Sequence, residues 1–488
     1  MRTFAPARAF ALGVSLSAAG GFGCQTPNPL PPAPRFPLTA VPAVGMNTPG
    51  AVPATAAVIP ASASQLEPAP APSPVPAPLA AAGAPLTLEA LEQLALANNP
   101  TLVQAATYID AARGKALQAG LPFNPTAGIS AEQIGAGGRA GEWTWFSLQQ
   151  QIVTGGKLRL SRLKYEHEAE LAEVQAQAQR LKVVNGLTAA YFEVLVDQRS
   201  VENHKRLAGN ADEAVKTTEQ LLNLGQANQQ DLLSAQVEAS QARVAVRTAE
   251  ARLRQGWTHL ATLIGVPDLP QQPLVGQLEP DGPALTWDDS LARLLQDSPE
   301  LAFAVAKVRQ DQTTVQRERR EPIPNVTVRG GVGYDYDTRS PTARAALSLP
   351  LPLFDRNQGT IRQATADLAR SQAEVTRVQL DLRRRLADAF TRYQTAQEEV
   401  VNFRDQVLPK AKKAAELYEE QFKARRAAFP QVLVARRTVF QLTEEYNRSL
   451  VQYRRAEVEV RGLLPVDGLS APSNPTPPGH INATPKPR

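Results

Sequence analysis

The feature of this sequence that most constrains its fold is an internal repeat, in which similar segments recur about 199 residues apart. Residues 86–102 align without a gap with residues 285–301. Further matches follow in the same order along both halves: Asn124 with Asn325, Gly156 with Gly359, Leu233 with Leu433, and Gly265 with Gly462. Chance similarity among Ala- and Leu-rich helices explains single matches but not a collinear series. Residues 86–284 and 285–465 are therefore predicted to be two copies of one architecture.

Each copy is predicted to hold a pair of strands after helix-forming sequence. Alternation of apolar and polar residues predicts strands at 124–134 and 142–153 in the first copy, and at 325–335 and 343–351 in the second. Tilted strands of about ten residues cross a bilayer, so these four are candidate transmembrane strands. Trp143 and Trp145 suit an aromatic belt at the membrane surface, or else ordinary packing in a soluble sheet.

Beyond the strands, the apolar period becomes helical for an unusual distance. From Ile361 to Val407 the stripe is interrupted only by Ser371, and a helix of this length, about 70 Å, requires a partner helix. Gly209 and Pro409, at matching positions, are predicted to bend the long helices. Breaks at residues 225–228 and 425–430 predict the tips of two antiparallel helical hairpins. The fold class is therefore α+β.

Four strands per chain cannot close a barrel around a space, and an open sheet edge cannot be left in lipid. The expected solution is oligomerisation, in which several chains pool their strands into one β-barrel and their hairpins into a tube of helices.

The two ends of the chain have a different composition from the middle. Arg2 and Arg8 precede a short apolar run, which predicts a signal peptide over residues 1–23. Cys24, the only cysteine, resembles the acylated cysteine of bacterial lipoproteins, although Gly21 and Phe22 depart from that motif; the alternative is an ordinary signal peptide with an incidental Cys. A Pro- and Ala-rich tether is predicted over residues 24–85 and a disordered tail over 466–488.

Composition also argues against several classes of function. The net charge is only +5 with no basic block, so we expect no nucleic-acid partner. One Cys and four scattered His argue against a disulfide framework, a Cys-rich zinc site or a cage of several His. The sequence contains no catalytic motif, so we expect no enzymatic activity, no cofactor and no metal site in the chain itself.

Several segments together resemble the TolC-like outer-membrane efflux proteins: Thr87-Leu88-x-x-Leu91 with Asn99-Pro100, Leu224-Gly225 with Asp231-Leu232-Leu233, and Leu263-x-Gly265. The resemblance covers about residues 86–465. It implies a homotrimer whose strands form a barrel in outer-membrane lipid and whose hairpins form an α-barrel in the periplasm. Such a channel is a passive exit duct that works with an inner-membrane pump through a periplasmic adaptor protein.

The segment from Leu349 to Gly359 is similar to that of the heavy-metal branch of this family, the cation-efflux channels. Pro350 and Pro352 cannot donate to a strand ladder, so pairing is predicted to stop there. The segment is alternatively a strand-to-helix turn shared by many branches. Two other functions use related parts: the outer channel of type I protein secretion, which shares the fold, and a periplasmic adaptor or structural coiled coil, which has helical hairpins.

The candidate site is the periplasmic entrance, where the hairpin tips would dock the adaptor: Gly225, Gln226, Asn228, Asp231, Arg425, Arg426 and Pro430. Asp231 has two interpretations. In a trimer it would form a ring of carboxylates that favours cations. Alternatively, it caps the start of the return helix, where an acid is favourable. The second copy has no acid at the aligned segment beginning with Pro430.

Overall fold

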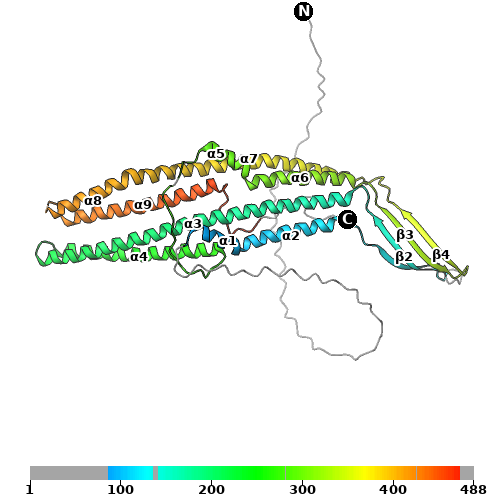
Figure 1. Cartoon of the computed structure of the whole chain (residues 1–488), viewed down its shortest axis with the longest axis horizontal. Helices are drawn as coiled ribbons and strands as arrows, with labels where there is room; N and C mark the ends of the chain where they lie inside the picture. The colour runs from blue at the N-terminus through cyan, green and yellow to red at the C-terminus, as the bar shows by residue number, and fades with distance from the viewer. Residues whose placement is uncertain (1–85, 136–140, 281, 425, 473–488) are drawn as a thin grey trace, which may run out of the picture. The chain divides into compact units, whose positions relative to one another are not determined.

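The computed structural model describes residues 86–135, 141–280, 282–424 and 426–472 (Figure 1). The predicted signal peptide, Cys24 and the tether lie outside these residues. The first half comprises α1 (Leu88–Asn98), α2 (Pro100–Gly120), β1 (Thr126–Glu132), β2 (Glu142–Ile152), α3 (Lys157–Asn223) and α4 (Gln229–Ile264). The second half comprises α5 (Trp287–Asp297), α6 (Pro299–Arg320), β3 (Val326–Asp335), β4 (Ser340–Ser348), α7 (Gln358–Asn402), the π-helical segment η2 (Phe403–Val407), α8 (Leu408–Lys423) and α9 (Phe429–Arg461).

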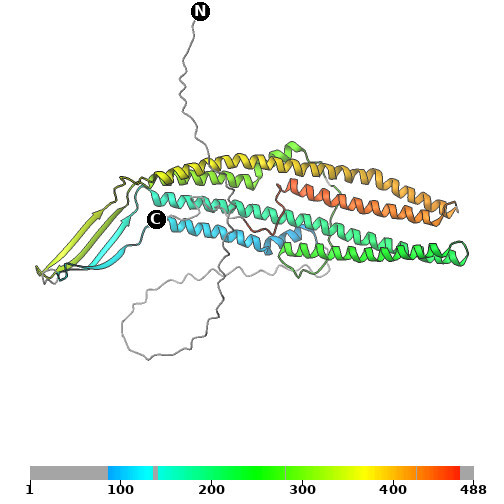
Figure 2. The ribbon, with the colours of Figure 1, turned by 180° about the vertical axis from the view of Figure 1, so that it is seen from behind.

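The helices form two hairpin-like groups that pack on each other. In the first, α2 and α4 lie end to end along α3, whose 67 residues extend for about 100 Å (Figure 2). In the second, α6 and α9 lie along the continuous rod formed by α7, η2 and α8. Helix α3 also contacts α6 and α9, which joins the two groups. No helix in the described part of the chain is long and apolar enough to cross a membrane.

The hydrophobic core is concentrated where α1 and α5 meet the long helices, and it includes most of the predicted 361–407 stripe. Two of the sequence motifs meet there: the Asn99 side chain donates a 2.7 Å hydrogen bond to the Leu263 carbonyl. Gly265 has a φ of +89°, and a Cβ at this position would lie 2.5 Å from the Asn98 carbonyl oxygen. Only glycine fits this contact. The side chains of Thr87 and Thr286 accept hydrogen bonds from backbone N–H groups in the first turns of α1 and α5, so each threonine caps its helix.

The two long helices differ at the residues that were predicted to bend them, Gly209 and Pro409. Helix α3 continues through Gly209 as one uninterrupted helix. In the second half the π-helical segment η2 ends two residues before Pro409. Proline lacks an N–H group and its ring crowds the preceding turn, whereas glycine only loses entropy. The wider π turn lets the helix continue past the proline.

The four strands form one antiparallel sheet in the order β1-β2-β3-β4. Its register has a bulge in β2, between Thr144 and Phe146. Strand β4 ends at Ser348, just before Pro350, as predicted from the missing donor. The strand β1 has seven residues and is shorter than expected.

The start of the predicted disordered tail needs correction. Residues 466–472 are described, and the buried side chain of Gln179 on α3 donates to the Gly468 and Ser470 carbonyl groups at 3.3 and 3.1 Å. Asn185 donates to the carbonyl of Pro465 at 2.7 Å. These buried amides fix the chain after α9 against α3. The remainder of the predicted tail lies outside the described residues.

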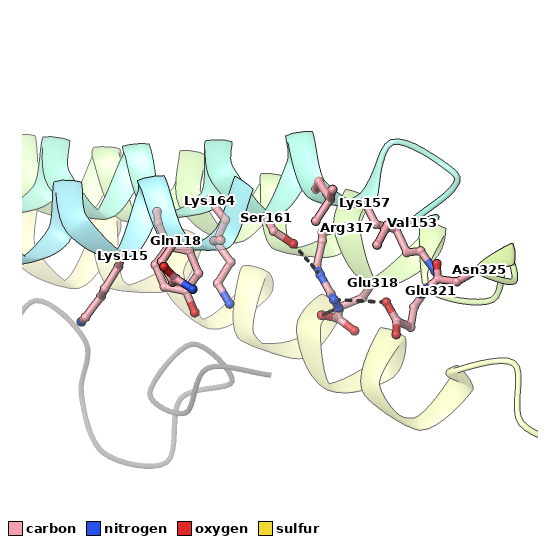
Figure 3. A pocket seen from close by; sticks show the side chains of 13 residues that line it. Lys115, Gln118, Val153, Lys157, Ser161, Lys164, Arg317, Glu318, Glu321 and Asn325 are labelled. Carbon is pink, nitrogen blue, oxygen red and sulfur yellow. Dashed lines mark hydrogen bonds and ion pairs between the residues drawn. The ribbon is translucent and has the colours of Figure 1, made fainter. Parts of the chain in front are cut away.

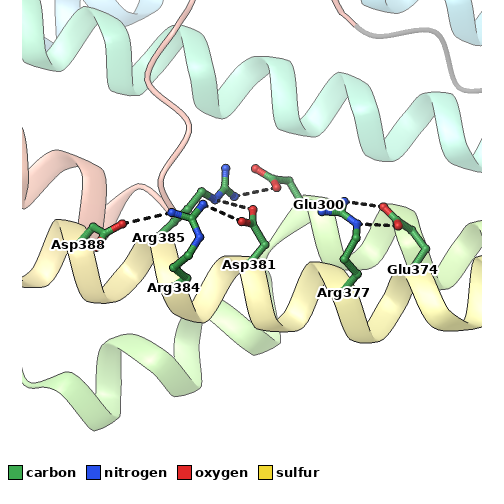
Figure 4. A network of polar contacts seen from close by, with 7 residues as sticks. All are labelled: Glu300, Glu374, Arg377, Asp381, Arg384, Arg385 and Asp388. Carbon is green, nitrogen blue, oxygen red and sulfur yellow. Dashed lines mark hydrogen bonds and ion pairs between the residues drawn. The ribbon is translucent and has the colours of Figure 1, made fainter.

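One exposed face of α7 carries a series of ion pairs (Figure 4). Glu374 pairs with Arg377 at 2.6 Å and Asp381 with Arg384 at 2.8 Å, each one helical turn apart. Arg385 reaches Glu300 of α6 at 2.7 Å. Pairs this exposed contribute little to stability individually, so this face is mainly a solvated surface.

Candidate functional site

The first hairpin tip is a short turn between α3 and α4. Gly225 adopts a φ of +70°, a left-handed conformation that favours glycine. The N–H group of Gln226 donates to the Leu221 carbonyl at 2.8 Å, which closes the end of α3. The turn then leads to Asn228, the cap of α4.

Asn228 and Asp231 form a reciprocal capping box. The Asp231 N–H donates to the Asn228 side chain at 2.8 Å, and the Asn228 N–H donates to the Asp231 carboxylate at 3.1 Å. Two otherwise unpaired donors of the helix start are satisfied in this way. The carboxylate of Asp231 is therefore engaged in the capping interaction, while the residue stays exposed to solvent.

The second tip, between α8 and α9, is closed differently. The N–H group of Arg426 donates to the Gln421 carbonyl at 2.7 Å. Pro430 lies in the first turn of α9, where a missing N–H costs nothing, and Ala428 supplies no side-chain cap. Arg425 lies outside the described residues. The two tips thus begin their return helices with different chemistry, a capping carboxylate in one and a proline in the other.

A cavity of about 1020 Å³ lies between the two tips. Of the predicted site residues, Gln226, Asp231 and Pro430 line it; Gly225, Asn228 and Arg426 are at the tips but not in its lining. The cavity wall carries both signs of charge, with Glu238 on α4 and Lys423 and Arg437 on the second hairpin. It is therefore a polar notch between hairpins and has no single sign of charge.

The ion pair between Glu238 and Arg437, with 2.8 Å between charged atoms, links the hairpins across this cavity. Sequence reasoning did not identify it. The pattern of neither helix marks this pair, because its two members lie 199 positions apart on different hairpins.

The histidines of the described chain are dispersed. His167 lies 3.2 Å from Glu170, whereas His204 packs against Phe440 and has a pKa lowered by burial. Within the described ranges, no group of three or more His, Cys, Asp or Glu side chains is placed to hold a metal ion.

Comparison with known proteins gives a consistent assignment. The family model described as outer membrane efflux protein matches residues 91–266 and 291–465. The cobalt-zinc-cadmium resistance protein CzcC of Cupriavidus metallidurans is 28% identical over 388 residues, which are 78% of this chain and 91% of that protein. The nickel-cobalt-cadmium resistance protein NccC of Alcaligenes xylosoxydans xylosoxydans is 27% identical over 60% of this chain and 66% of its own length.

Among solved structures, a membrane protein from Pseudomonas aeruginosa superposes with a TM-score of 0.65 at 21% identity. The superposition covers 77% of this chain and 92% of that one, so the fold is shared across nearly all of the described residues. The predicted resemblance to TolC-like efflux proteins, including the heavy-metal branch, is confirmed by these matches. The chain belongs to the outer membrane efflux protein family.

Proposed function

We propose that the protein is the outer-membrane exit duct of a tripartite efflux system for divalent heavy-metal cations. Three copies would close one β-barrel in the outer membrane and one helical tunnel in the periplasm, and Cys24 would add a lipid anchor. The hairpin tips would dock a periplasmic adaptor that connects the duct to an inner-membrane pump. The duct itself is passive. In this proposal residues 86–284 and 285–465 are the two copies of a duplicated unit.

The observation that carries the proposal is the separation of side chains between the two faces of the sheet. By the strand register, one face is almost entirely apolar, with Gln150 as its exception: Ala127, Leu148, Phe146, Trp143, Val328, Val332, Tyr334, Ala343, Ala345 and Leu347. Several of these side chains are exposed in the single chain, Leu347 by 67% and Val332 by 58%. An apolar face of this size needs lipid or protein against it.

The opposite face is polar, as the lumen of a barrel requires. Arg329 donates to Gln149 at 3.0 Å, and Arg344 donates to Glu132 at 2.8 Å and to Glu142. The first and last strands, β1 and β4, each have a free edge in the described sheet, which supports closure with neighbouring copies. At the turn end of the strands, Trp145 stacks on Tyr334 with 6.2 Å between ring centroids, which supports an aromatic belt at the membrane surface.

The metal substrate class is supported by the relatives, whose names record resistance to cobalt, cadmium, zinc and nickel. Export of proteins, as in type I secretion, uses the same fold and is the second candidate; no feature of the tips favours it. An adaptor is less consistent with a sheet that has one apolar face.

The test is metal tolerance in a Gram-negative host that lacks its own channel but carries the cognate pump and adaptor. The chain should restore growth on cobalt, zinc or cadmium, and the pump-inactivated host should gain nothing. Cross-linking in the same cells should report trimers. Restored secretion of a protein substrate without metal tolerance would instead favour the type I assignment.

A further inference from the structure

A pocket of about 200 Å³ lies where the sheet meets the helices, apart from the hairpin tips (Figure 3). Its wall includes Val153, just after β2, and Asn325, just before β3, together with residues of α2, α3 and α6. In the proposed function this level is the periplasmic boundary of the outer membrane, and the inference below rests on that placement for the source of its ligand.

Positive side chains dominate the pocket wall. The wall contains four cationic residues and two carboxylates: Lys115, Lys157, Lys164 and Arg317, with Glu318 and Glu321. Two of the cations already have anionic partners: Arg317 lies 3.0 Å from Glu318 and 3.2 Å from Glu321, and Lys115 lies 2.7 Å from Glu168. Those pairs account for the carboxylates, so the positive charge of the two remaining lysines is not neutralised by an ion pair.

Lys164 is the least compensated of these groups. It is only 5% exposed, and in the described part of the chain its ammonium donates no hydrogen bond and forms no ion pair within 4.0 Å. Its ammonium lies 5.0 Å from the centre of the Tyr165 ring, and the carboxylates of Glu318 and Glu168 attract it from beyond ion-pair distance. Burial, together with nearby Arg317, lowers the pKa of Lys164 to about 8, so it still carries a proton at neutral pH. A mostly buried cation without an ion-pair partner is costly, and an anion in the pocket would offset that cost.

Lys157 provides a second donor on the same face of α3, seven residues earlier. It is 6% exposed, and its ammonium donates one 2.8 Å hydrogen bond, to the Ile323 carbonyl, without an ion pair to any described carboxylate. An ammonium has three donors, so two remain for a ligand. Figure 3 shows Lys164 pointing to the same side as Lys115 and Gln118 of α2, which add further donors to the pocket.

We propose that this pocket binds a phosphate group, held by Lys164 and Lys157, and that the group belongs to the headgroup of an anionic membrane phospholipid. The pocket is small for a complete drug-sized ligand but suits a single headgroup. Phosphate offers several acceptor oxygens to ammonium donors. A lipid bound here would attach the helices to the membrane at the point where the strands begin.

The experiment uses the full-length protein purified in detergent, with phosphatidylglycerol and phosphatidylcholine offered separately. Native mass spectrometry reports bound lipid, and a melting curve with and without inorganic phosphate reports binding of the group alone. The variants are Lys164→Met and Lys157→Met. Lys216→Met is the matched control, because Lys216 is an exposed lysine on the same helix.

Wild type and Lys216→Met should retain phosphatidylglycerol in preference to phosphatidylcholine. Loss of Lys164 should weaken that binding by about tenfold or more, the effect of losing a hydrogen bond to a charged group. Without phosphate, Lys164→Met should melt no lower than wild type, because it removes an uncompensated charge, and phosphate should no longer raise its melting temperature. Lys157→Met keeps the proposal testable if Lys164→Met misfolds.

The outcomes separate the possible sources of the ligand. A phosphate-dependent rise in melting temperature without retained phosphatidylglycerol would leave the phosphate site standing but overturn the lipid as its source. Equal lipid retention by all four proteins, with no effect of phosphate, would overturn the site. The phosphate measurement needs no membrane, so a failure of metal tolerance would refute the proposed function without refuting this pocket.

Discussion

The apolar face of the sheet can be tested with a pair of neighbouring residues. Leu148 and Ser147 are adjacent in the middle of β2 and, by the strand register, point to opposite faces. Leu148 is 44% exposed in the single chain, whereas the Ser147 hydroxyl donates to the Gly128 carbonyl at 2.8 Å. The proposed barrel places Leu148 in lipid and Ser147 in the lumen, so the same substitution should have different effects at the two sites.

Leu148→Arg should destabilise the folded protein by about 2–4 kcal/mol, the cost of an arginine near the bilayer midplane. This corresponds to a folding equilibrium about 30- to 700-fold less favourable. Ser147→Arg should lose only the hydrogen bond to Gly128, about 1 kcal/mol, because its guanidinium remains in water.

The assay is a urea titration of protein reconstituted in vesicles, followed by tryptophan fluorescence, with heat-resistant oligomer on gels as a second measure. The two variants differ only in the face that carries the charge, so each controls for the other. Equal destabilisation by both substitutions, or tolerance of Leu148→Arg, would refute the assignment of faces and the barrel built on it.

Two further predictions concern the helices. Asp231→Ala should remove the capping box and lower the stability of the first hairpin by about 1 kcal/mol, seen as a lower melting temperature. Ion selectivity, measured as the reversal potential, should stay unchanged. Altered selectivity without a lower melting temperature would favour a ring of carboxylates. Burial, and then the charge of Glu193, raise the pKa of Asp197 to about 6. The folded protein therefore binds this proton more tightly than the unfolded chain does, so the stability of the fold decreases as pH rises from about 4 to 6. At pH 7.5, Asp197→Asn should therefore be more stable than wild type by at most about 3 kcal/mol and should unfold at a higher temperature. This gain should vanish at pH 4. A gain that persists at pH 4 would show that it does not come from the ionisation of Asp197.

Much of the architecture could be predicted because it depends on local chemistry. Properties of a few neighbouring residues determine the caps at Thr87 and Thr286 and the end of β4 before Pro350. They also determine the apolar stripe of residues 361–407. The alternation in β3 likewise determined which side chains share a face, since strand geometry has a period of two.

The features that were missed depend on contacts between distant segments. The buried amide of Gln179 that holds the chain after α9, and the pocket around Lys164, both involve polar residues on helices. In sequence such residues look like any solvated helix face. Their burial is decided by which other helix packs there, and the pattern of one helix does not contain that information. Helix α3 also continues through Gly209 without a break, because a single glycine costs a long helix only about 1 kcal/mol.

The divergence of the two copies itself contributes to the assembly. Glu238 and Arg437 attract each other at the hairpin junction, whereas the positions aligned with them in the other copy, Thr438 and Val237, carry no charge. This ion pair helps to hold the first hairpin against the second. The start of the return helices has diverged as well, with the capping Asp231 in one tip and Pro430 in the other. A partner that docks at the tips therefore meets two chemically different surfaces in each chain, so a docking segment could distinguish the first hairpin from the second even though both have the same backbone design.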